Sequence, residues 1–520
     1  MRSTTSSLIR RLPRSKHGIS PRNLSVEASA PDVQYTTLPN KIRVATETTP
    51  GHFSSVGLYV DAGTRYETSS TSGVCHFIDR MAFKTTETRS EEEMFTAIHS
   101  LGGQIMCSSS REAIMYQSSH FHSATPQALS LIADTVLNPG FLEEELLSQR
   151  DAARYEIREI KAKPEMIIPE ILHEVAYNHT GLGNPMLCPE DRIDLIDRNI
   201  LLGGMKAWFR PERMVIAGSG MQHEELVELV DKYFSSLKPS TTHTSSSQPR
   251  QNSPPPHLLN SSAPSPSKFT RAASYLFPTS TPAPSDPPSL LTKSSYTGGH
   301  KYIRDTSAEF NHLYIGFEGV GIHDEDIYAL ATMQVLLGGG GSFSAGGPGK
   351  GMYSRLYTHI LNHFPQIDHC ASFHHIYTDS SLFGLFASFV PASSGLRGGN
   401  TPSQIMPHLV HQLSLLLYTP IPAAELSRAK NQLKSSLMMA LESRAVGVED
   451  LGRQILVHNR KVPVSEMTDK IDLIGAEDIR RVANRIFGPK SGNKPTVVCM
   501  GHEDTGDWQS VFRKYSVASS

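Results

Sequence analysis

The chain has 520 residues, of which 49 are Lys or Arg and 51 are Asp or Glu, and its formal net charge is −2 at pH 7. This length predicts two to four packed units, and the balanced charge excludes a general nucleic-acid binder, because no excess of cations faces the phosphates. No run of about 18 apolar residues and no CxxC pair occurs, so we expect no transmembrane segment and five free cysteines in a reducing compartment.

Residues 1–30 differ in composition from the rest of the chain. Six basic residues, set among many serines, precede the first acidic residue, Glu27. Leu8, Ile9 and Leu12 would share one face of a helix, and the nearby arginines would point elsewhere. No long apolar stretch follows, which disfavours a secretory signal. We therefore expect a mitochondrial targeting presequence over residues 1–30; the alternative is a basic tail with no targeting role.

The first half of the chain mixes strand and helix signals. Apolar residues alternate over 56–60, which predicts a half-buried strand. Ser90 and Glu93 have the spacing of a capping box that begins a helix, and Gly102-Gly103 would end it. Because strands and helices come in clusters, we expect the α+β class, with mixed β-sheets that carry helices mainly on one face.

Residues 73–84 have the spacing of a zinc-peptidase helix without its chemistry. In the H-x-x-E-H pattern two histidines bind zinc and the glutamate activates a water molecule. His76 takes the first ligand position, Asp79 stands in the base position with a shorter side chain, and Arg80 replaces the second ligand. A guanidinium has no lone pair, and about 4 Å from a dication it adds on the order of 8 kcal/mol of repulsion before relaxation. We expect no zinc here.

This helix resembles that of the pitrilysin-type metallopeptidases, and among them the mitochondrial processing peptidase family. In that family a third zinc ligand is a glutamate far downstream, which corresponds to Glu156, and a further acid seven positions earlier corresponds to Gln149. The resemblance implies that only His76 and Glu156 keep the family's residues, whereas Asp79, Arg80 and Gln149 are altered. It therefore implies no metal and no catalytic residue on this chain, and a packed, hydrogen-bonded His76.

Two segments repeat the same order of signals. Residues 193–209 and 471–487 both begin with Ile-Asp-Leu-Ile and both end in phenylalanine after an amphipathic helix. In each case a Pro-containing turn and a short strand follow, at 214–217 and 496–500. The repetition predicts two homologous domains.

Between the repeats, residues 239–300 have the composition of a disordered insertion or linker. More than half of these positions are Ser, Thr or Pro, and few could contribute to a core. We therefore place the N-terminal domain, with the altered zinc motif, at 35–238, and the C-terminal domain at 301–520. Apolar alternation over 313–317 predicts another half-buried strand in the second domain.

The second domain contains a glycine-rich segment between two apolar helical runs. A phosphate-binding loop is disfavoured, because Ser344 and Gly351 stand where a P-loop needs Gly and Ser or Thr. A metal site at His359 and His363 is disfavoured, because Ile360 replaces the glutamate of HExxH. A main chain with few side chains can hold extended peptides of many sequences, so the segment is a candidate substrate-binding site; its alternative is a flexible connection. The candidate residues are Gly338, Gly339, Gly340, Gly341, Ser342, Phe343, Ser344, Ala345, Gly346, Gly347, Pro348, Gly349, Lys350 and Gly351.

Residues 338–357 and the sequence Tyr296-Thr-Gly-Gly299 resemble the alpha branch of the mitochondrial processing peptidase family. This resemblance implies a non-catalytic subunit of the mitochondrial matrix that binds presequence peptides of imported precursors. It also implies a heterodimer in which the beta subunit carries the zinc cofactor and the general base.

Two alternative functions remain at this stage. One is a structural core subunit of the respiratory cytochrome bc complex, which resembles the same family; the glycine-rich segment argues against it, since a scaffold has no evident use for such a segment. The other, an active zinc peptidase working alone, requires Arg80 to be tolerated beside a metal ion.

Overall fold

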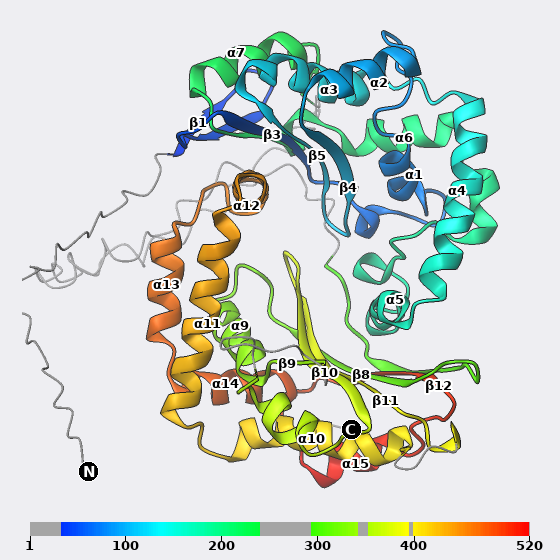
Figure 1. The fold of residues 1–520 in the computed structure, drawn as a ribbon, viewed down its shortest axis with the longest axis vertical. Helices are drawn as coiled ribbons and strands as arrows, with labels where there is room; N and C mark the ends of the chain where they lie inside the picture. Colours follow the sequence, from blue (N-terminus) through cyan, green and yellow to red (C-terminus); the bar gives the residue numbers. More distant parts are fainter. Residues whose placement is uncertain (1–32, 240–292, 342–351, 395–398, 519–520) are drawn as a thin grey trace, which may run out of the picture.

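The computed structural model describes residues 33–239, 293–341, 352–394 and 399–518. Figure 1 shows two halves stacked along the long axis of the molecule, each built on one sheet with helices packed against it. The predicted presequence, residues 1–30, and most of the predicted insertion, residues 240–292, lie outside the described residues.

The first half begins with three strands, and its remaining strands alternate with groups of helices. Its strands are β1 (Val33–Thr37), β2 (Arg43–Glu47), β3 (Phe53–Val60), β4 (Gln104–Ser109), β5 (Ile114–Phe121) and β6 (Met214–Ser219). Its helices are α1 (Val74–Arg80), α2 (Glu91–Ser100), α3 (Thr125–Leu137), α4 (Glu143–Lys161), α5 (Pro164–Ala176), α6 (Arg198–Trp208) and α7 (His223–Phe234). The predicted capping box is confirmed at the start of α2, where Ser90 and Glu93 each accept a hydrogen bond from the other's backbone N–H.

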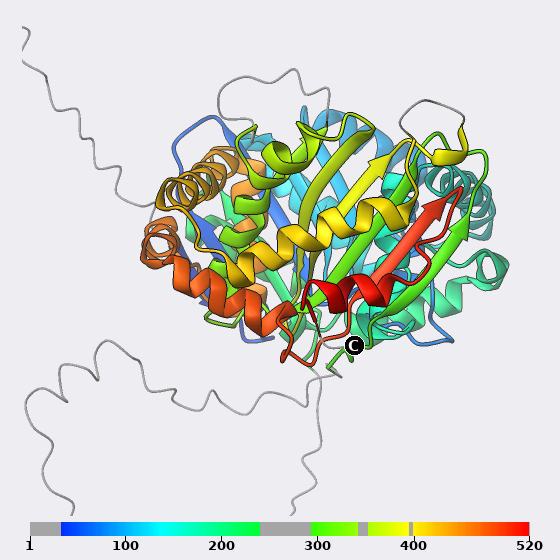
Figure 2. The same ribbon diagram turned by 90° about the horizontal axis from the view of Figure 1, so that it is seen from below.

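The second half follows the same plan. Its strands are β7 (Gly299–Arg304), β8 (Asn311–Gly319), β9 (Gly339–Gly341), β10 (Ile367–Ile376), β11 (Ser381–Phe389) and β12 (Thr496–Gly501). Its helices are α9 (Ile327–Leu337), α10 (Pro402–Tyr418), α11 (Ala423–Leu441), α12 (Arg444–His458), α13 (Val464–Leu473), α14 (Ala476–Phe487) and α15 (Trp508–Lys514). Figure 2 shows α10, in yellow, and α15, in red, lying across the strands of this sheet.

The two sheets share the topology of five strands, and each has one further edge strand, β1 in the first sheet and β9 in the second. Their strand orders are β1-β2-β6-β3-β5-β4 and β7-β12-β8-β11-β10-β9. In each sheet one parallel pair, β2 with β6 or β7 with β12, is followed by antiparallel neighbours. The repeated segments 193–209 and 471–487 lead into the equivalent strands β6 and β12. The structure therefore confirms the predicted α+β class with two related domains.

Each half also provides one helix to the sheet of the other half. Helix α12 of the second half packs on the first sheet, where Val448, Leu451 and Ile455 share a core cluster with Tyr59 of β3. Helix α5 of the first half packs on β8 and β12 of the second sheet. These two exchanged helices cover the sheet faces that the other helices leave open.

One sequence prediction is wrong because of these exchanged helices. The strands at 56–60 and 313–317 were expected to be half-buried, but both faces of β3 are buried along Ser54–Val60, and β8 is buried over most of its length. The prediction is wrong because alternation within a strand does not show that a helix from the other half of the chain covers its second face.

A glycine inside α12 makes the contact with Tyr59 possible. A Cβ added at Gly452 would overlap the Tyr59 ring, whereas a Cβ added at Gly447 meets nothing closer than 3.9 Å. Gly452→Ala should therefore lower the free energy of unfolding by about 1–3 kcal/mol, because overpacking outweighs the better helix propensity of alanine. Gly447→Ala should leave it unchanged or raise it by up to about 1 kcal/mol. Urea unfolding measures both variants, and equal effects would contradict this packing.

The second domain begins before residue 301. Ser294 is buried and its Oγ accepts a hydrogen bond from Leu182 N at 3.2 Å, and Thr297 N donates to Ala176 O at 2.8 Å. Strand β7 already starts at Gly299. The predicted insertion therefore extends too far: its last residues, from Ser294 onward, pack against the first half and enter the second sheet.

A buried arginine joins the two halves. Arg65, in the 3-10 turn Thr64–Tyr66, is 6% exposed. Its guanidinium donates to both carboxylate oxygens of Asp379, at 3.1 and 3.0 Å, and also to Glu112. It donates further to Ser294 Oγ at 3.3 Å. Glu112 belongs to the first half, whereas Asp379 and Ser294 belong to the second. The guanidinium therefore adds a polar link between the halves to the packing of the exchanged helices.

Candidate functional site

Helices α1 and α4 of the first half bring together four of the five zinc-motif positions, two of them retained and two altered. Helix α1 begins after Gly73, whose φ of 90° and close approach to a neighbouring cysteine both require glycine. His76 and Arg80 lie one turn apart on α1. His76 contacts Glu156 of α4, and Arg80 contacts both Glu156 and Gln149 of the same helix. The family spacing thus corresponds to a real cluster in space.

The Arg80 guanidinium is the cation of this cluster. It donates to Glu156 Oε2 and, at 3.0 Å, to Gln149 Oε1. His76 Nε2 lies 3.3 Å from the same Glu156 oxygen. A covalently attached positive charge therefore occupies the position between the histidine, the glutamate and the glutamine.

His76 is held as a neutral imidazole. The backbone N–H of Cys188 donates to His76 Nδ1 at 3.1 Å, so the ring proton resides on Nε2 and points to Glu156. The residue is 6% exposed, and burial lowers the pKa of His76 in spite of the Glu156 carboxylate. A histidine that binds a metal through Nε2 carries its proton on Nδ1 instead, so the Cys188 N–H opposes that arrangement.

Asp79, in the position of the catalytic base, is engaged elsewhere. Its Oδ2 accepts a hydrogen bond from Ser109 N at 2.7 Å, at the end of the edge strand β4. The carboxylate therefore fastens α1 to the first sheet. It is not among the side chains to which Arg80 donates, which are Glu156 and Gln149.

These residues do not fit a zinc ion. Arg80 offers no lone pair and fills the position of a ligand, and His76 presents a proton where a ligand needs a lone pair. Elsewhere in the described residues, no group of three or more His, Cys, Asp or Glu side chains could hold a metal ion. His359, which the sequence had disfavoured as a ligand, donates from Nδ1 to Gln412 Oε1 at 2.9 Å.

The glycine-rich candidate segment is described only at its start. Gly338 ends α9 with a φ of 58°, and its carbonyl accepts a hydrogen bond from Ser372 N at 2.8 Å. Gly339–Gly341 form β9, the edge strand of the second sheet, paired antiparallel with His369–Ala371 of β10. Residues 342–351 lie outside the described residues. The segment therefore starts as a sheet edge, which glycine composition did not predict, because glycine weakens strands.

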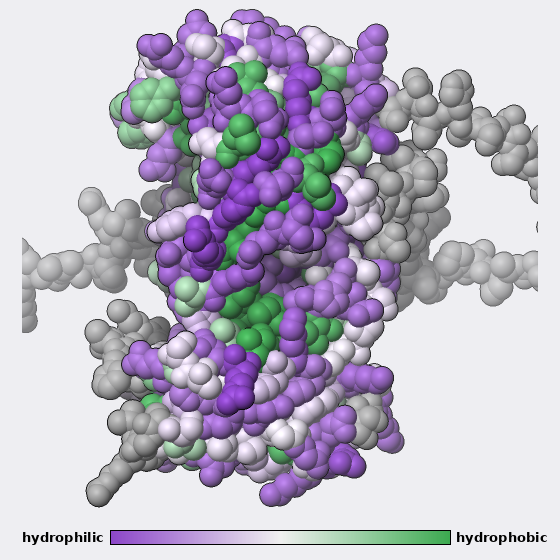
Figure 3. Space-filling view, turned by 90° about the vertical axis from the view of Figure 1, so that its right-hand side faces the viewer, coloured by the Kyte–Doolittle hydropathy of each residue, from purple (hydrophilic) through white to green (hydrophobic). Residues whose placement is uncertain are grey.

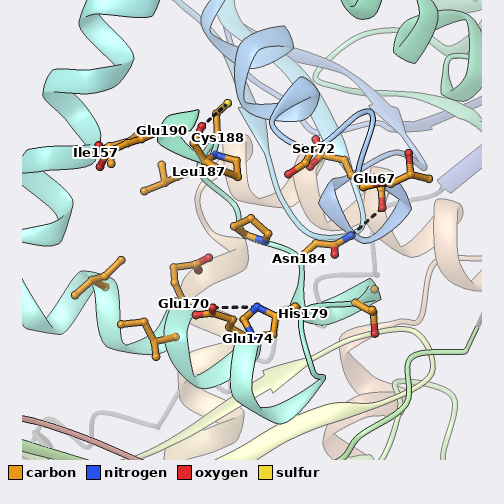
Figure 4. Close-up of a pocket in the computed structure, with 18 of the residues that line it drawn as sticks. Glu67, Ser72, Ile157, Glu170, Glu174, His179, Asn184, Leu187, Cys188 and Glu190 are labelled. Atoms are coloured by element: carbon orange, nitrogen blue, oxygen red, sulfur yellow. Dashed lines mark hydrogen bonds and ion pairs between the residues drawn. The ribbon is translucent and has the colours of Figure 1, made fainter. Parts of the chain in front are cut away.

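A cavity of about 650 Å³, which sequence reasoning missed, lies beside the Arg80 cluster. Its walls come from α4, α5 and the segments 67–72 and 179–190, as Figure 4 shows. Cys188 lines the cavity and also donates its N–H to His76, so the two sites are neighbours. No local sequence signal could have found this cavity, because distant segments form it.

Two family descriptions match the chain. Residues 43–190 match insulinase, peptidase family M16, and residues 196–433 match the M16 inactive domain. The first match contains the Arg80 cluster, and the second contains the glycine-rich segment Gly338–Gly351.

Curated relatives cover most of the chain. It is 43% identical over 501 residues to "Mitochondrial-processing peptidase subunit alpha" of Neurospora crassa, with 89% of this chain and 85% of that protein aligned. It is 37% identical to the probable subunit alpha of Schizosaccharomyces pombe, with 94% and 89% aligned. The human subunit alpha is 32% identical, with 90% and 82% aligned.

Solved structures share the fold at lower identity. A chain of complex III from Candida albicans has a TM-score of 0.72 and 17% identity, covering 93% of this chain and 99% of that one. A protease from Helicobacter pylori has a TM-score of 0.72 and 18% identity, covering 91% and 100%. These two structures support the two-domain fold alone.

Proposed function

The chain belongs to peptidase family M16, and from this premise we propose that it is the non-catalytic, presequence-binding alpha subunit of a mitochondrial processing peptidase. One observation carries the proposal: in a chain 43% identical to a named subunit alpha, Arg80 pairs with Glu156 in the position of a zinc ligand. A subunit built in this way supplies binding rather than hydrolysis.

The proposal divides the work between two chains. The partner, a beta subunit of the same family, provides the zinc ion and the base that activates water. This chain contributes the candidate segment Gly338–Gly351 and half of the chamber in which the peptide lies. The substrates are N-terminal presequences of imported precursors, which are basic and amphipathic, and the complex acts in the mitochondrial matrix.

The sheet edge at β9 supports peptide binding at the glycine-rich segment. The strand lies at the end of the second sheet and pairs only with β10 within the described residues. A Cβ at Gly340 would meet nothing within 4 Å, so the face of the sheet at this strand is open and leaves room for side chains of a bound peptide. Main-chain hydrogen bonds to such an edge bind peptides with little regard for side chains.

The alternative function, a core subunit of the cytochrome bc complex, has weaker support. The complex III chain is only 17% identical and shares the fold, whereas the relatives named subunit alpha reach 43% identity. Among the described residues, no helix has the length and apolarity to cross a membrane.

Deletion of residues 342–351, with Gly338–Gly341 retained, tests the proposal. Because β9 and its pairing with β10 stay intact, the variant should fold and should co-purify with the zinc-bearing partner. We expect precursor binding to weaken by at least about tenfold, which corresponds to a loss of roughly 1.4 kcal/mol, and processing to slow accordingly. Binding is measured by fluorescence anisotropy with a labelled presequence.

The matched control removes an equal number of residues from the insertion, within 240–292. It should leave binding and processing unchanged. If the deletion at 342–351 leaves precursor affinity and processing rate at the level of this control, the receptor role of the segment is wrong.

A further inference from the structure

The cavity beside the Arg80 cluster has a chemistry that the glycine-rich segment does not explain. Its volume of about 650 Å³ lies in the usual range of ligand pockets. Figure 3 shows the face that carries α4 and α5: it is hollowed near its middle, and hydrophobic residues gather beside the hollow. A hollow lined by exposed apolar groups favours an occupant that has apolar groups of its own.

Apolar side chains form much of the cavity wall. Ile157 of α4, Ile167 and Ile171 of α5 and Leu187 of the following loop all line it. Ile157 is buried, and the other three are half-buried, so the cavity opens to solvent on the side of α5 and the loop. Ile167 and Ile171 also pack in part against the cluster that joins α5 to the second sheet. The helix is therefore fixed in place, and these two side chains give only their remaining exposed surface to the cavity.

Carboxylates outnumber ammonium groups around the cavity. Glu170, Glu174 and Glu190 line it together with a single lysine, Lys161. Glu170 and Glu190 each use one carboxylate oxygen in their ion pair, and within the described residues the second oxygen accepts no hydrogen bond. The present ion pairs are Glu170 with Arg111, Glu174 with His179 and Lys301, and Glu190 with Lys161. The partners of Glu174 and Glu190 are open to solvent, and such pairs are weak, so an incoming guanidinium can share these two carboxylates at little cost. Arg111 is buried, so Glu170 can offer only its second oxygen.

We infer that this cavity binds the apolar face of a basic amphipathic peptide. The carboxylates of Glu170, Glu174 and Glu190 then bind the arginine or lysine side chains that flank this face. The inference rests on the proposed presequence binding and adds a second docking place for the same substrate. It also places the peptide next to an inert site: Cys188 lines the cavity and holds His76 in the non-ligand tautomer. A peptide can therefore rest there without being cut.

The test uses a peptide whose sequence this chain itself supplies. A fluorescein-labelled peptide with the sequence of residues 2–22 carries Leu8, Ile9 and Leu12 among its arginines. The protein is the complete chain in complex with its partner subunit, freed of zinc by a chelator so that the peptide stays intact. Fluorescence anisotropy gives the dissociation constant.

The decisive variant fills the cavity. Ile171→Trp should weaken peptide binding on the order of tenfold, because it removes the space for one buried aliphatic side chain. Replacing Leu8, Ile9 and Leu12 of the peptide by serine should weaken binding similarly. The two changes together should cost little more than either alone, because both remove one contact. The control Leu473→Trp places the same side chain on an exposed position of α13, outside the cavity lining, and should leave binding unchanged.

Several outcomes would overturn the inference. Additive losses for the protein and peptide changes would show that the apolar face docks elsewhere, and unchanged peptide binding with weaker subunit association would show that the cavity is a subunit contact. If Ile171→Trp unfolds the chain, Leu187→Gln in the loop replaces it as the protein variant that is combined with the serine-substituted peptide. A wild-type complex that does not bind the peptide contradicts the proposed function itself, whereas binding that ignores the cavity variants contradicts only this inference.

Discussion

Replacing Arg65 by methionine should lower the free energy of unfolding by about 3–5 kcal/mol, although no part of the proposed peptide site is touched. The guanidinium is buried and donates to both oxygens of Asp379 and to Glu112. Methionine fills a similar volume but leaves two carboxylates facing each other at the seam between the halves. Removing one partner of a buried ion pair costs far more than removing an exposed pair, because the remaining charges lose their compensation.

Urea unfolding followed by tryptophan fluorescence can measure this effect in each half. The chain has two tryptophans, Trp208 in the first half and Trp508 in the second, so both transitions are visible. The control Arg460→Met removes an exposed ion pair with Glu466 and should cost less than about 1 kcal/mol. Equal losses in Arg65→Met and the control would show that the seam does not depend on Arg65.

The same seam has a defined pH dependence. Burial alone would raise the pKa of Asp379, but the hydrogen bonds and charge of Arg65 hold this pKa below its ordinary value. A carboxyl with a lowered pKa stabilises the fold fully above the ordinary value of about 3.9, and this contribution is lost as the pH falls through the lower pKa of the folded state. Burial raises the pKa of Glu112 in spite of Arg65, so Asp379 is the partner that stabilises the seam at the acid end. The gap between wild type and Arg65→Met should therefore shrink below about pH 4.

Local sequence patterns predicted where helices and strands form better than they predicted which other elements pack against them. The capping box at Ser90 and the repeated order around 193–209 and 471–487 depend on neighbours in sequence, and both predictions are confirmed. The burial of β3 and β8 depends on α12 and α5, which come from the opposite halves of the chain. No window of one strand contains that information, so the half-buried prediction was wrong.

The candidate site shows the same division. The side-chain types at positions 76, 79 and 80 were enough to predict that zinc does not bind at this motif, because a guanidinium cannot be a zinc ligand in any fold. The sequence did not predict that Arg80 would pair with Gln149 and Glu156, or that Ser109 would bind Asp79. It also missed the hydrogen bond from Cys188 to His76, because that partner lies 112 positions away along the chain.

The largest functional change that we expect from one substitution is the return of a metal site. Arg80→His removes the guanidinium that fills the cluster and leaves two histidines one turn apart on α1, facing Glu156. This set of donors is one that zinc prefers in tetrahedral sites. The wild-type chain should bind no zinc, and the variant should bind about one ion per molecule, as measured by metal analysis after dialysis.

The restored site should still be weak and inactive. If zinc binds His76 Nε2, the ring proton must reside on Nδ1. Nδ1 then has no lone pair to accept the hydrogen bond that the Cys188 N–H donates in the wild-type chain. Leaving that donor unsatisfied costs about 1–3 kcal/mol, so the affinity should be roughly 10-fold to 100-fold lower than for a histidine with an acceptor at Nδ1. Hydrolysis should not return, because Asp79 remains bonded to Ser109 N and has a shorter side chain than glutamate. Arg210→His, away from the cluster, is the control; stoichiometric zinc in the wild-type chain, or none in Arg80→His at high zinc, would show that Arg80 is not what keeps the metal out.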